Sequence, residues 1–304
     1  MTTCSRRTFL AASAAAAALP RFLTAADDGP WLRQSVKGGM LRVEGGWVEK
    51  LNAAKAAGFE GVEPNTAPGL AVEELKAAAA ETGVAVDGTV GGYHWQVRHT
   101  DPDNAVRTKA QRLLEQSLKQ TAALGADTFL IVPGHGKDGD RETVERKATR
   151  AIKAVLPMAE DLGVRILIEN VWNEMFYDPA GGTDQSAQAL ADFIDRFESD
   201  FVGTQFDLGN HWKYGDVAGW VRTLGPRIKK LDIKGFSRAA GQFTDVTEGD
   251  IDWAGVRAAL AEVGFTGWVA AEVGGGDVAR LTTIHDQVDA ALHCDKTLAE
   301  VKKG

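Results

Sequence analysis

The chain has 304 residues, 44% of them hydrophobic and 25% charged, with a formal net charge of −8. These values are ordinary for a soluble globular protein, and the length suits one α/β barrel of about 250 residues. The acidic balance argues against nucleic acid or an anionic membrane as a partner. With only Cys4 and Cys294, neither an internal disulfide framework nor a multi-thiolate metal site is expected.

Residues 1–25 are predicted to be a twin-arginine export signal and not part of the fold. Ser5-Arg6-Arg7-Thr8-Phe9-Leu10 precedes a weakly hydrophobic run from Ala11 to Leu19, and Leu23-Thr24-Ala25 offers a cleavage site. The run is too short to span a bilayer, which takes about 20 apolar residues; the alternative is a disordered basic terminus. Removal of residues 1–25 takes away three arginines and no acid, which moves the net charge to −11. The mature protein is expected in the periplasm or otherwise exported, without a membrane anchor.

From about residue 31, short apolar runs alternate with amphipathic helical segments. The predicted strands lie near 32–36, 61–63, 84–89, 128–133, 164–169, 202–207, 228–232 and 267–272. The predicted helices cover about 47–57, 71–82, 104–124, 141–162, 184–197, 216–224, 253–263 and 276–292. This alternation predicts an α/β fold of the (β/α)8 TIM-barrel type. An open doubly wound sheet is the alternative, but no Gly-x-Gly-x-x-Gly follows the first strand.

Four acidic residues each close one of the last four strands: Glu169, Asp207, Asp232 and Glu272. In a parallel barrel the carboxyl ends of the strands meet at one rim, where active sites lie. Converging carboxylates repel one another unless a cation lies between them. A single acid could equally cap a helix or pair with a buried arginine, but four at equivalent positions indicate a metal site. Oxygen ligands favour Mn²⁺, Mg²⁺ or Co²⁺ over copper or structural zinc.

Further polar residues are expected on the same rim as substrate contacts. Lys234 follows Asp232 by two positions and so shares its face of the strand. His211 lies just past Asp207, where it is either a surface residue or folds back toward the metal. The predicted substrate-binding residues are Glu63, His94, His135, His211 and Lys234. Trp95, Trp172 and Phe176 are candidates for an apolar wall that contacts a sugar ring, although aromatic residues in a barrel usually serve packing.

Several of these segments resemble motifs of the xylose isomerase-like TIM-barrel superfamily of sugar isomerases and epimerases, and the resemblance covers most of residues 31–292. The segments are Ile168-Glu-Asn-Val-Trp-Asn173, Phe206-Asp-Leu-Gly-Asn210, Glu248-Gly-Asp-Ile-Asp-Trp253 and Gly267-Trp-Val-Ala-Ala-Glu272. The resemblance implies one such barrel over residues 26–304. It also implies metal-binding roles for Glu169, Asp207 and Glu272, and acid/base roles for Glu169 and Glu272 on opposite faces of a hydroxyketone.

One position departs from this pattern. The relatives carry His at the end of strand seven, in a His-x-Lys segment, whereas this chain has Leu231-Asp-Ile-Lys234. A fourth carboxylate adds negative charge, which should raise carboxylate basicity and weaken the Lewis acidity of the metal. Three outcomes are open: Asp232 is itself a ligand, His211 supplies a nitrogen with Asp232 behind it, or the site is degenerate.

The leading hypothesis is an exported sugar isomerase or epimerase that depends on a divalent metal (Mn, Co, Mg or Zn) and acts on an unphosphorylated carbohydrate. The alternatives are a 3-keto-glycoside lyase with the same proton abstraction next to a carbonyl, and a non-catalytic carbohydrate-binding barrel. The expected partner is a small carbohydrate and not nucleic acid; the sequence leaves a homo-oligomer open.

Overall fold

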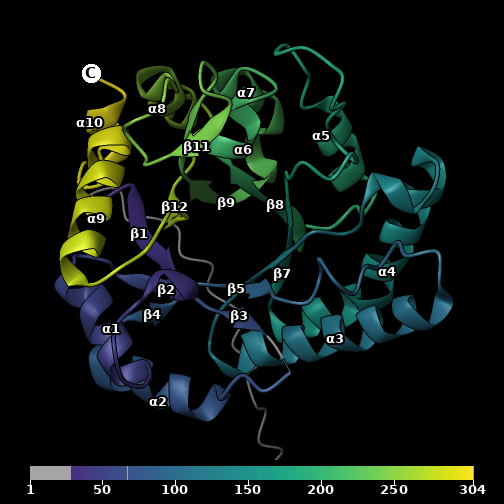
Figure 1. The fold of residues 1–304 in the computed structure, drawn as a ribbon, viewed down its shortest axis with the longest axis horizontal. Helices are drawn as coiled ribbons and strands as arrows, with labels where there is room; N and C mark the ends of the chain where they lie inside the picture. Colours follow the sequence, from purple (N-terminus) through teal and green to yellow (C-terminus); the bar gives the residue numbers. More distant parts are fainter. Residues whose placement is uncertain (1–28, 67, 304) are drawn as a thin grey trace, which may run out of the picture.

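A computed structural model describes residues 29–66 and 68–303, so the predicted export signal lies outside the described residues. In this part of the chain, helices surround a central parallel sheet (Figure 1). The sheet contains β1 (Leu32–Lys37), β2 (Gly61–Glu63), β3 (Asn65–Thr66), β4 (Ala85–Val86), β5 (Thr89–Gly91), β6 (Thr128–Ile131), β7 (Arg165–Glu169), β8 (Val202–Asp207), β9 (Ile228–Ile233) and β12 (Gly267–Ala271). The main outer helices are α1 (Trp47–Ala56), α2 (Val72–Thr82), α3 (Asn104–Ala123), α4 (Arg141–Leu162), α5 (Gln188–Asp195), α7 (Val217–Leu224), α8 (Trp253–Glu262) and α9 (Val278–Leu292).

The strands close into a barrel with eight positions, because two of the positions are each divided into two short strands. β2 and β3 lie on either side of Pro64, which has no N–H for the ladder, and β4 and β5 lie on either side of Asp87 and Gly88. β1 pairs with β12 and β2, β2 with β4, β3 with β5, and the chain of parallel pairs continues from β5 through β6, β7, β8 and β9 to β12. The predicted TIM barrel is therefore confirmed.

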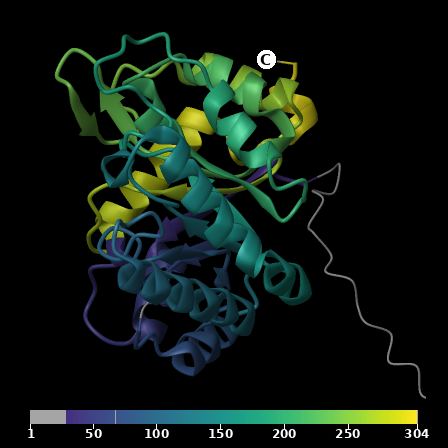
Figure 2. The ribbon, with the colours of Figure 1, turned by 90° about the vertical axis from the view of Figure 1, so that its right-hand side faces the viewer.

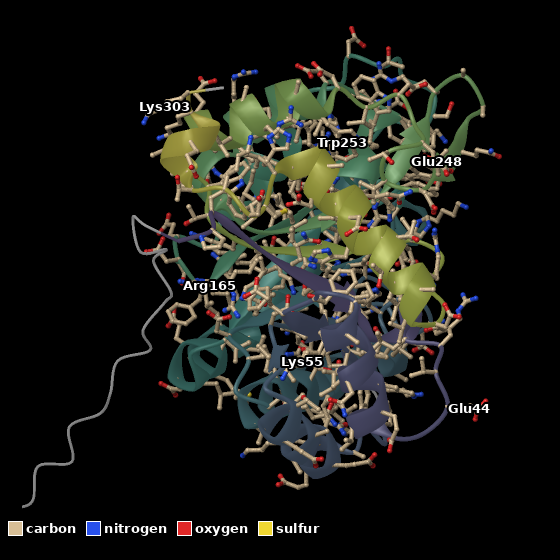
Figure 3. The ribbon with its side chains drawn as sticks, turned by 90° about the vertical axis from the view of Figure 1, so that its left-hand side faces the viewer. Glu44, Lys55, Arg165, Glu248, Trp253 and Lys303 are labelled. Carbon is tan, nitrogen blue, oxygen red and sulfur yellow. The ribbon has the colours of Figure 1, made fainter. Side chains whose placement is uncertain are left out.

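The helices begin and end where local sequence signals favour it. The side chains of Asp103, Asp140, Asp216, Asp252 and Asp277 each accept a backbone N–H at the start of a helix. Gly83 and Gly163 take the left-handed conformation that ends α2 and α4. Exposed charged side chains such as Lys303, and Glu44 on the loop before α1, lie at the edge of the molecule (Figure 3). Among the helices of residues 29–66 and 68–303, none is long and apolar enough to cross a membrane.

Alternation along β9 separates a hydrophobic layer from a polar barrel interior. Leu231 and Ile233 are fully buried in the hydrophobic core between the strands and the helices. Lys230 and Asp232 are also buried, but they point to the opposite face, because successive side chains of a strand alternate. The inside of the barrel thus carries charged side chains where β9 passes through it.

Two features at the carboxyl end of the barrel, and one short helix at the end of the described chain, were not predicted. A short helix, α6 (Leu208–Trp212), follows β8 at once, and an antiparallel hairpin of β10 (Gly235–Ser237) and β11 (Gln242–Thr244) follows β9. The hairpin stands out from the barrel at upper left in Figure 2. A last helix, α10 (Leu298–Val301), closes the described chain. Both α6 and the hairpin are too short to produce a clear hydrophobic period.

The glycine run after β12 fixes the loop that carries Glu272. Gly276 exchanges backbone hydrogen bonds with the loop after β1, donating to Met40 O at 3.1 Å and accepting from Arg42 N at 3.1 Å. At Gly275 the two backbones are so close that a Cβ atom would lie 2.1 Å from Met40 O, whereas at Gly274 a Cβ atom would meet nothing within 4 Å. Gly275 is required for close approach of the two loops.

We expect Gly275→Ala to lower the free energy of unfolding by about 1–3 kcal/mol, because the loop after β1 must move away from the added methyl group. Gly274→Ala is the matched control and should change it by less than about 0.5 kcal/mol. Urea unfolding of both variants measures the difference. Equal stability of the two variants would contradict the close approach at Gly275.

Candidate metal centre

Four carboxylates meet at the carboxyl end of the barrel, where β7, β8, β9 and β12 lie side by side. Glu169 and Asp207 are the last residues of β7 and β8, Asp232 precedes the last residue of β9, and Glu272 directly follows β12. Each offers one oxygen, and these oxygens all lie within 4.8 Å of one another. The structure therefore brings together all four acids that the sequence placed at strand ends.

The four acids differ in their access to solvent. Glu169, Asp207 and Asp232 are buried, whereas the Glu272 side chain is 39% exposed. Asp207 also caps α6, because its Oδ1 accepts a hydrogen bond from Asn210 N at 2.8 Å. Asn170 fixes the backbone of Asp207 by donating to its carbonyl oxygen and accepting from its N–H. The capping role considered for a single acid thus applies to one oxygen of Asp207, and its other oxygen faces the cluster.

Lys234 joins the exposed and buried sides of this cluster. Its Nζ atom lies 2.7 Å from Asp207 Oδ2 and 2.7 Å from Glu272 Oε2. The ammonium group also lies 4.8 Å from the centre of the Phe243 ring on β11. The attraction of these acids outweighs burial and raises the pKa of Lys234, so the side chain stays charged.

The pKa values of the four acids reflect their burial and their mutual repulsion. Burial, together with repulsion from Glu272, Asp232 and Asp207, raises the pKa of Glu169 well above its usual value. Burial likewise raises the pKa of Asp207 to about 6 and that of Asp232 to about 7. Burial acts in the same direction on Glu272, but Lys234 and Lys37 outweigh it and lower the pKa. A cation placed among these groups would relieve this repulsion.

A second polar layer lies inside the barrel beneath the four acids. Lys230 Nζ is 2.6 Å from Glu63 Oε1 and 2.6 Å from Asp87 Oδ2. Gln205 Nε2 donates to Glu63 Oε2 at 3.0 Å and to Asp232 Oδ1 at 2.8 Å. Lys37 contacts both Glu63 and Asp232, the latter at 2.8 Å. Asp232 is therefore connected through hydrogen bonds and ion pairs to the middle of the barrel.

Glu63, which was predicted to contact the substrate, is the last residue of β2, and its side chain is buried inside the barrel. It is 1% exposed and its carboxylate is occupied by Lys230, Lys37 and Gln205. Although burial opposes ionisation, the two lysines lower the pKa of Glu63 to about 2. Glu63 thus contacts Lys37 and Gln205, which both contact Asp232.

The histidines predicted as substrate contacts have different surroundings. His94 is buried and accepts a hydrogen bond from Val132 N at 3.2 Å through Nδ1. His135 is partly exposed and caps a short 3₁₀ turn through Lys137 N. Burial lowers the pKa of His94 to about 3, so its ring is neutral at physiological pH.

His211 lies outside the four-acid cluster. Its ring stacks on Trp220 with 3.7 Å between ring centres, and its Nδ1 lies 3.1 Å from the Tyr177 hydroxyl. The side chain is fully buried, and burial lowers its pKa to about 3. In this position His211 supports α6 through aromatic packing, and the structure gives no support to a nitrogen ligand from it.

Two aromatic rings form a wall beside the cluster. Trp172 stacks on Phe243 with 4.8 Å between ring centres and 14° between ring planes. Phe243 is 44% exposed, so this wall borders solvent. Phe176 is instead buried against Phe193 and serves packing, and the exposed Trp95 lies on the loop after β5.

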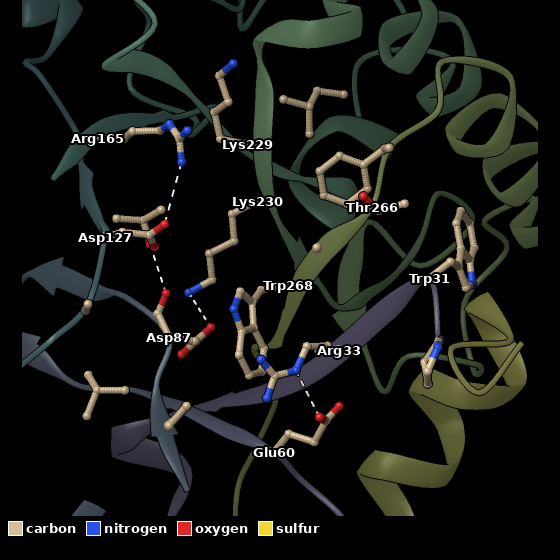
Figure 4. A pocket seen from close by; sticks show the side chains of 18 of the residues that line it. Trp31, Arg33, Glu60, Asp87, Asp127, Arg165, Lys229, Lys230, Thr266 and Trp268 are labelled. Carbon is tan, nitrogen blue, oxygen red and sulfur yellow. Dashed lines mark hydrogen bonds and ion pairs between the residues drawn. The ribbon is translucent and has the colours of Figure 1, made fainter. Parts of the chain in front are cut away.

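A cavity of about 630 Å³ lies at the opposite, amino-terminal end of the barrel, around the first residues of β1, β4, β7, β9 and β12. Figure 4 shows Arg33, Arg165, Lys229 and Lys230 around it. The Lys230–Asp87 ion pair lines this cavity and also belongs to the second polar layer. The polar interior thus extends from the carboxylate cluster to the other end of the barrel.

Sequence reasoning missed the residues that support the cluster: Lys37, Asp87, Gln205 and Lys230. A signal for two of them was present, because Lys230 precedes Asp232 by two residues and Gln205 precedes Asp207 by two, which places each pair on one face. The contact of Lys37 with Asp232 depends on the pairing of β1, β12 and β9 and leaves no mark in the local sequence.

Comparisons with known proteins agree with this architecture. The family described as Xylose isomerase-like TIM barrel matches residues 51–293. An L-ribulose 3-epimerase structure has a TM-score of 0.74 at 18% identity, covering 90% of this chain and 98% of that one. A D-tagatose 3-epimerase-like protein has a TM-score of 0.72 at 14% identity, with coverages of 89% and 98%. A D-allulose 3-epimerase from Methylomonas sp. has a TM-score of 0.67 at 16% identity, with coverages of 86% and 99%.

A comparison with curated proteins found no match. The identities to the solved structures are low, so these structures establish the shared fold. The family match extends over most of the barrel, from α1 to the end of α9. This chain belongs to the Xylose isomerase-like TIM barrel family.

Proposed function

We propose that this chain is a divalent-metal-dependent sugar isomerase or epimerase, which acts on an unphosphorylated sugar by abstracting a proton next to a carbonyl. The observation that carries the proposal is the convergence of four carboxylates within 4.8 Å at the catalytic end of the barrel. The solved structures named above, with names that specify ketose 3-epimerases, support the same class of reaction.

The side chains present fit a divalent metal ion. The proposed ligands are Glu169, Asp207, Asp232 and Glu272, which supply carboxylate oxygens of the kind that Mn²⁺, Co²⁺, Mg²⁺ and Zn²⁺ accept. Burial and repulsion from the other three acids raise the pKa of Glu169, and a bound cation would offset this repulsion. When bound, the ion supplies Lewis acidity that polarises the sugar carbonyl and acidifies the neighbouring C–H.

The acid/base work falls to Glu169 and Glu272. They come from β7 and β12, which are separated in the sheet by β8 and β9, so they approach a bound sugar from different sides. In our proposal one carboxylate takes the proton from the sugar carbon and the other returns a proton to the opposite face. Lys234, between Asp207 and Glu272, stabilises negative charge that develops on a substrate oxygen. The Trp172–Phe243 wall contacts the C–H face of the sugar.

A metal-content measurement tests the site itself. We expect about one divalent ion per purified mature chain, and at least tenfold weaker binding in Glu169→Gln and Glu272→Gln, because each variant loses one carboxylate ligand. Glu73→Gln on the exposed face of α2 is the control and should bind metal like the wild type. Elemental analysis and titration calorimetry measure both quantities. A wild-type chain that neither contains nor binds divalent ions would contradict the proposal.

A second prediction concerns the reaction. With metal, the wild type should exchange a substrate C–H with solvent deuterium when ketoses such as ribulose, tagatose and allulose are screened by NMR in D₂O. Both Glu variants should lose this exchange by more than about 100-fold, because general acid/base catalysis contributes roughly 10²–10⁴-fold. Exchange with release of an aglycone from a 3-keto-glycoside would identify the lyase alternative. Sugar binding without exchange would identify a binding protein.

We also propose that the mature protein works in the periplasm or is otherwise exported, and the support is the Arg6-Arg7 pair followed by a short hydrophobic run. Replacement of both arginines by lysine should leave the precursor in the cytoplasm, as seen by cell fractionation. Arg21→Lys, outside the pair, is the control. Undiminished export of the double variant would contradict twin-arginine transport.

A further inference from the structure

Both carboxylate oxygens of Asp232 already have hydrogen-bond or ion-pair partners. Lys37 Nζ lies 2.8 Å from its Oδ1 and 2.9 Å from its Oδ2, and Gln205 Nε2 donates to Oδ1 at 2.8 Å. Asp232 is fully buried and the Lys37 side chain is 12% exposed. The two donors to Oδ1 occupy that oxygen, whereas Oδ2 accepts from Lys37 alone and keeps a lone pair for a cation.

The charge of Asp232 matters because Glu169, Asp207 and Glu272 already bring three carboxylates to the proposed site. Asp232 adds a fourth negative charge to this group. Lys37 brings one positive charge to the same two oxygens. Among residues 29–66 and 68–303, no second lysine, arginine or histidine lies within 4.0 Å of the Asp232 carboxylate.

We propose that Lys37 is a positioning residue that compensates the charge of Asp232, so that the Asp232–Lys37 pair acts toward the metal as one neutral ligand. This inference rests on the proposed metal-dependent function. It assigns a role to a residue that lies at the end of β1, on the far side of β12 from Asp232 in the sheet order.

The contacts of Glu63 argue against the alternative that Lys37 serves only to neutralise Glu63. Glu63 also contacts Lys37, but it already has Lys230 at 2.6 Å and Gln205 at 3.0 Å. Lys230 in turn shares its charge with Asp87. Removal of Lys37 therefore leaves Glu63 with a cation, whereas it leaves Asp232 with the neutral Gln205 amide only. The charge of Lys37 is needed at Asp232.

A double-mutant cycle of Asp232→His and Lys37→Met tests the inference, with Mn²⁺ affinity measured by titration calorimetry and by electron paramagnetic resonance. Asp232→His alone should weaken Mn²⁺ binding by about tenfold or more, because the Lys37 ammonium then faces a neutral ring and repels the ion. Lys37→Met alone should strengthen binding by several-fold, since Asp232 loses its counter-charge. The double variant should return to within about threefold of the wild type. This rescue is the non-additive signature of a coupled pair.

Lys229→Met is the matched control. Lys229 lies on the same strand next to Lys230, is half-buried, and lines the cavity at the other end of the barrel. It should neither change Mn²⁺ affinity by more than about twofold nor rescue Asp232→His. Thermal unfolding without metal is recorded for every variant, so that a folding defect is separated from a change in affinity.

Two results would overturn the inference while the proposed function stands. One is that the wild type binds Mn²⁺ while Asp232→His and the double variant bind it equally weakly. The other is that Lys37→Met binds Mn²⁺ with unchanged affinity. If the double variant does not fold, the affinity of Lys37→Met alone decides. Absence of Mn²⁺ binding in the wild type would instead overturn the proposed function, and this inference with it.

Discussion

Mutual repulsion among buried carboxylates is the constraint on which the interior of this barrel depends. Two unit charges 4 Å apart repel by about 4 kcal/mol at an effective dielectric constant of about 20. Four carboxylate oxygens within 4.8 Å of one another would therefore oppose folding unless positive charge lay among them. Lys234 supplies it on the solvent side of the cluster, and Lys37 supplies it beside Asp232. A divalent ion would complete the same compensation.

Positive and negative side chains also alternate further inside the barrel, so charge is compensated there as well. Lys37 and Lys230 share Glu63, and Lys230 also holds Asp87. Loss of one member of such a buried network leaves a partner charged and desolvated, which costs more than the pair contributes when complete. The arrangement therefore fixes one set of side-chain positions beneath Asp232. A site that must hold its ligands within a fraction of an ångström benefits from such a support.

The sequence predicted well the features that depend on a local period or on the end of a helix or strand. It predicted less well the contacts between strands that are distant in the chain. The eight strand positions and the outer helices agree with the predicted ranges, because apolar periods, aspartate caps and glycine ends are local signals. The convergence of Glu169, Asp207, Asp232 and Glu272 could be predicted, because all four occupy equivalent ends of parallel strands. His211 could not be placed, because only the packing of α6 on Trp220 determines where its ring points.

Other features depend on pairing across the whole chain. Lys37 meets Asp232 only because β12 lies between β1 and β9 in the closed barrel. The division of two strand positions at Pro64 and at Asp87-Gly88 was also not predicted. The hairpin of β10 and β11, which brings Phe243 over Lys234, has too few residues to reveal a period of two.

The unequal exposure of the four acids leaves the cluster one side that is open to the surrounding solution. Glu272 is the most exposed of the four acids. Lys234 bridges it to Asp207, and the Lys234 ammonium also lies over the Phe243 ring. A cation entering from that side would meet Glu272 and Lys234 before the three buried carboxylates.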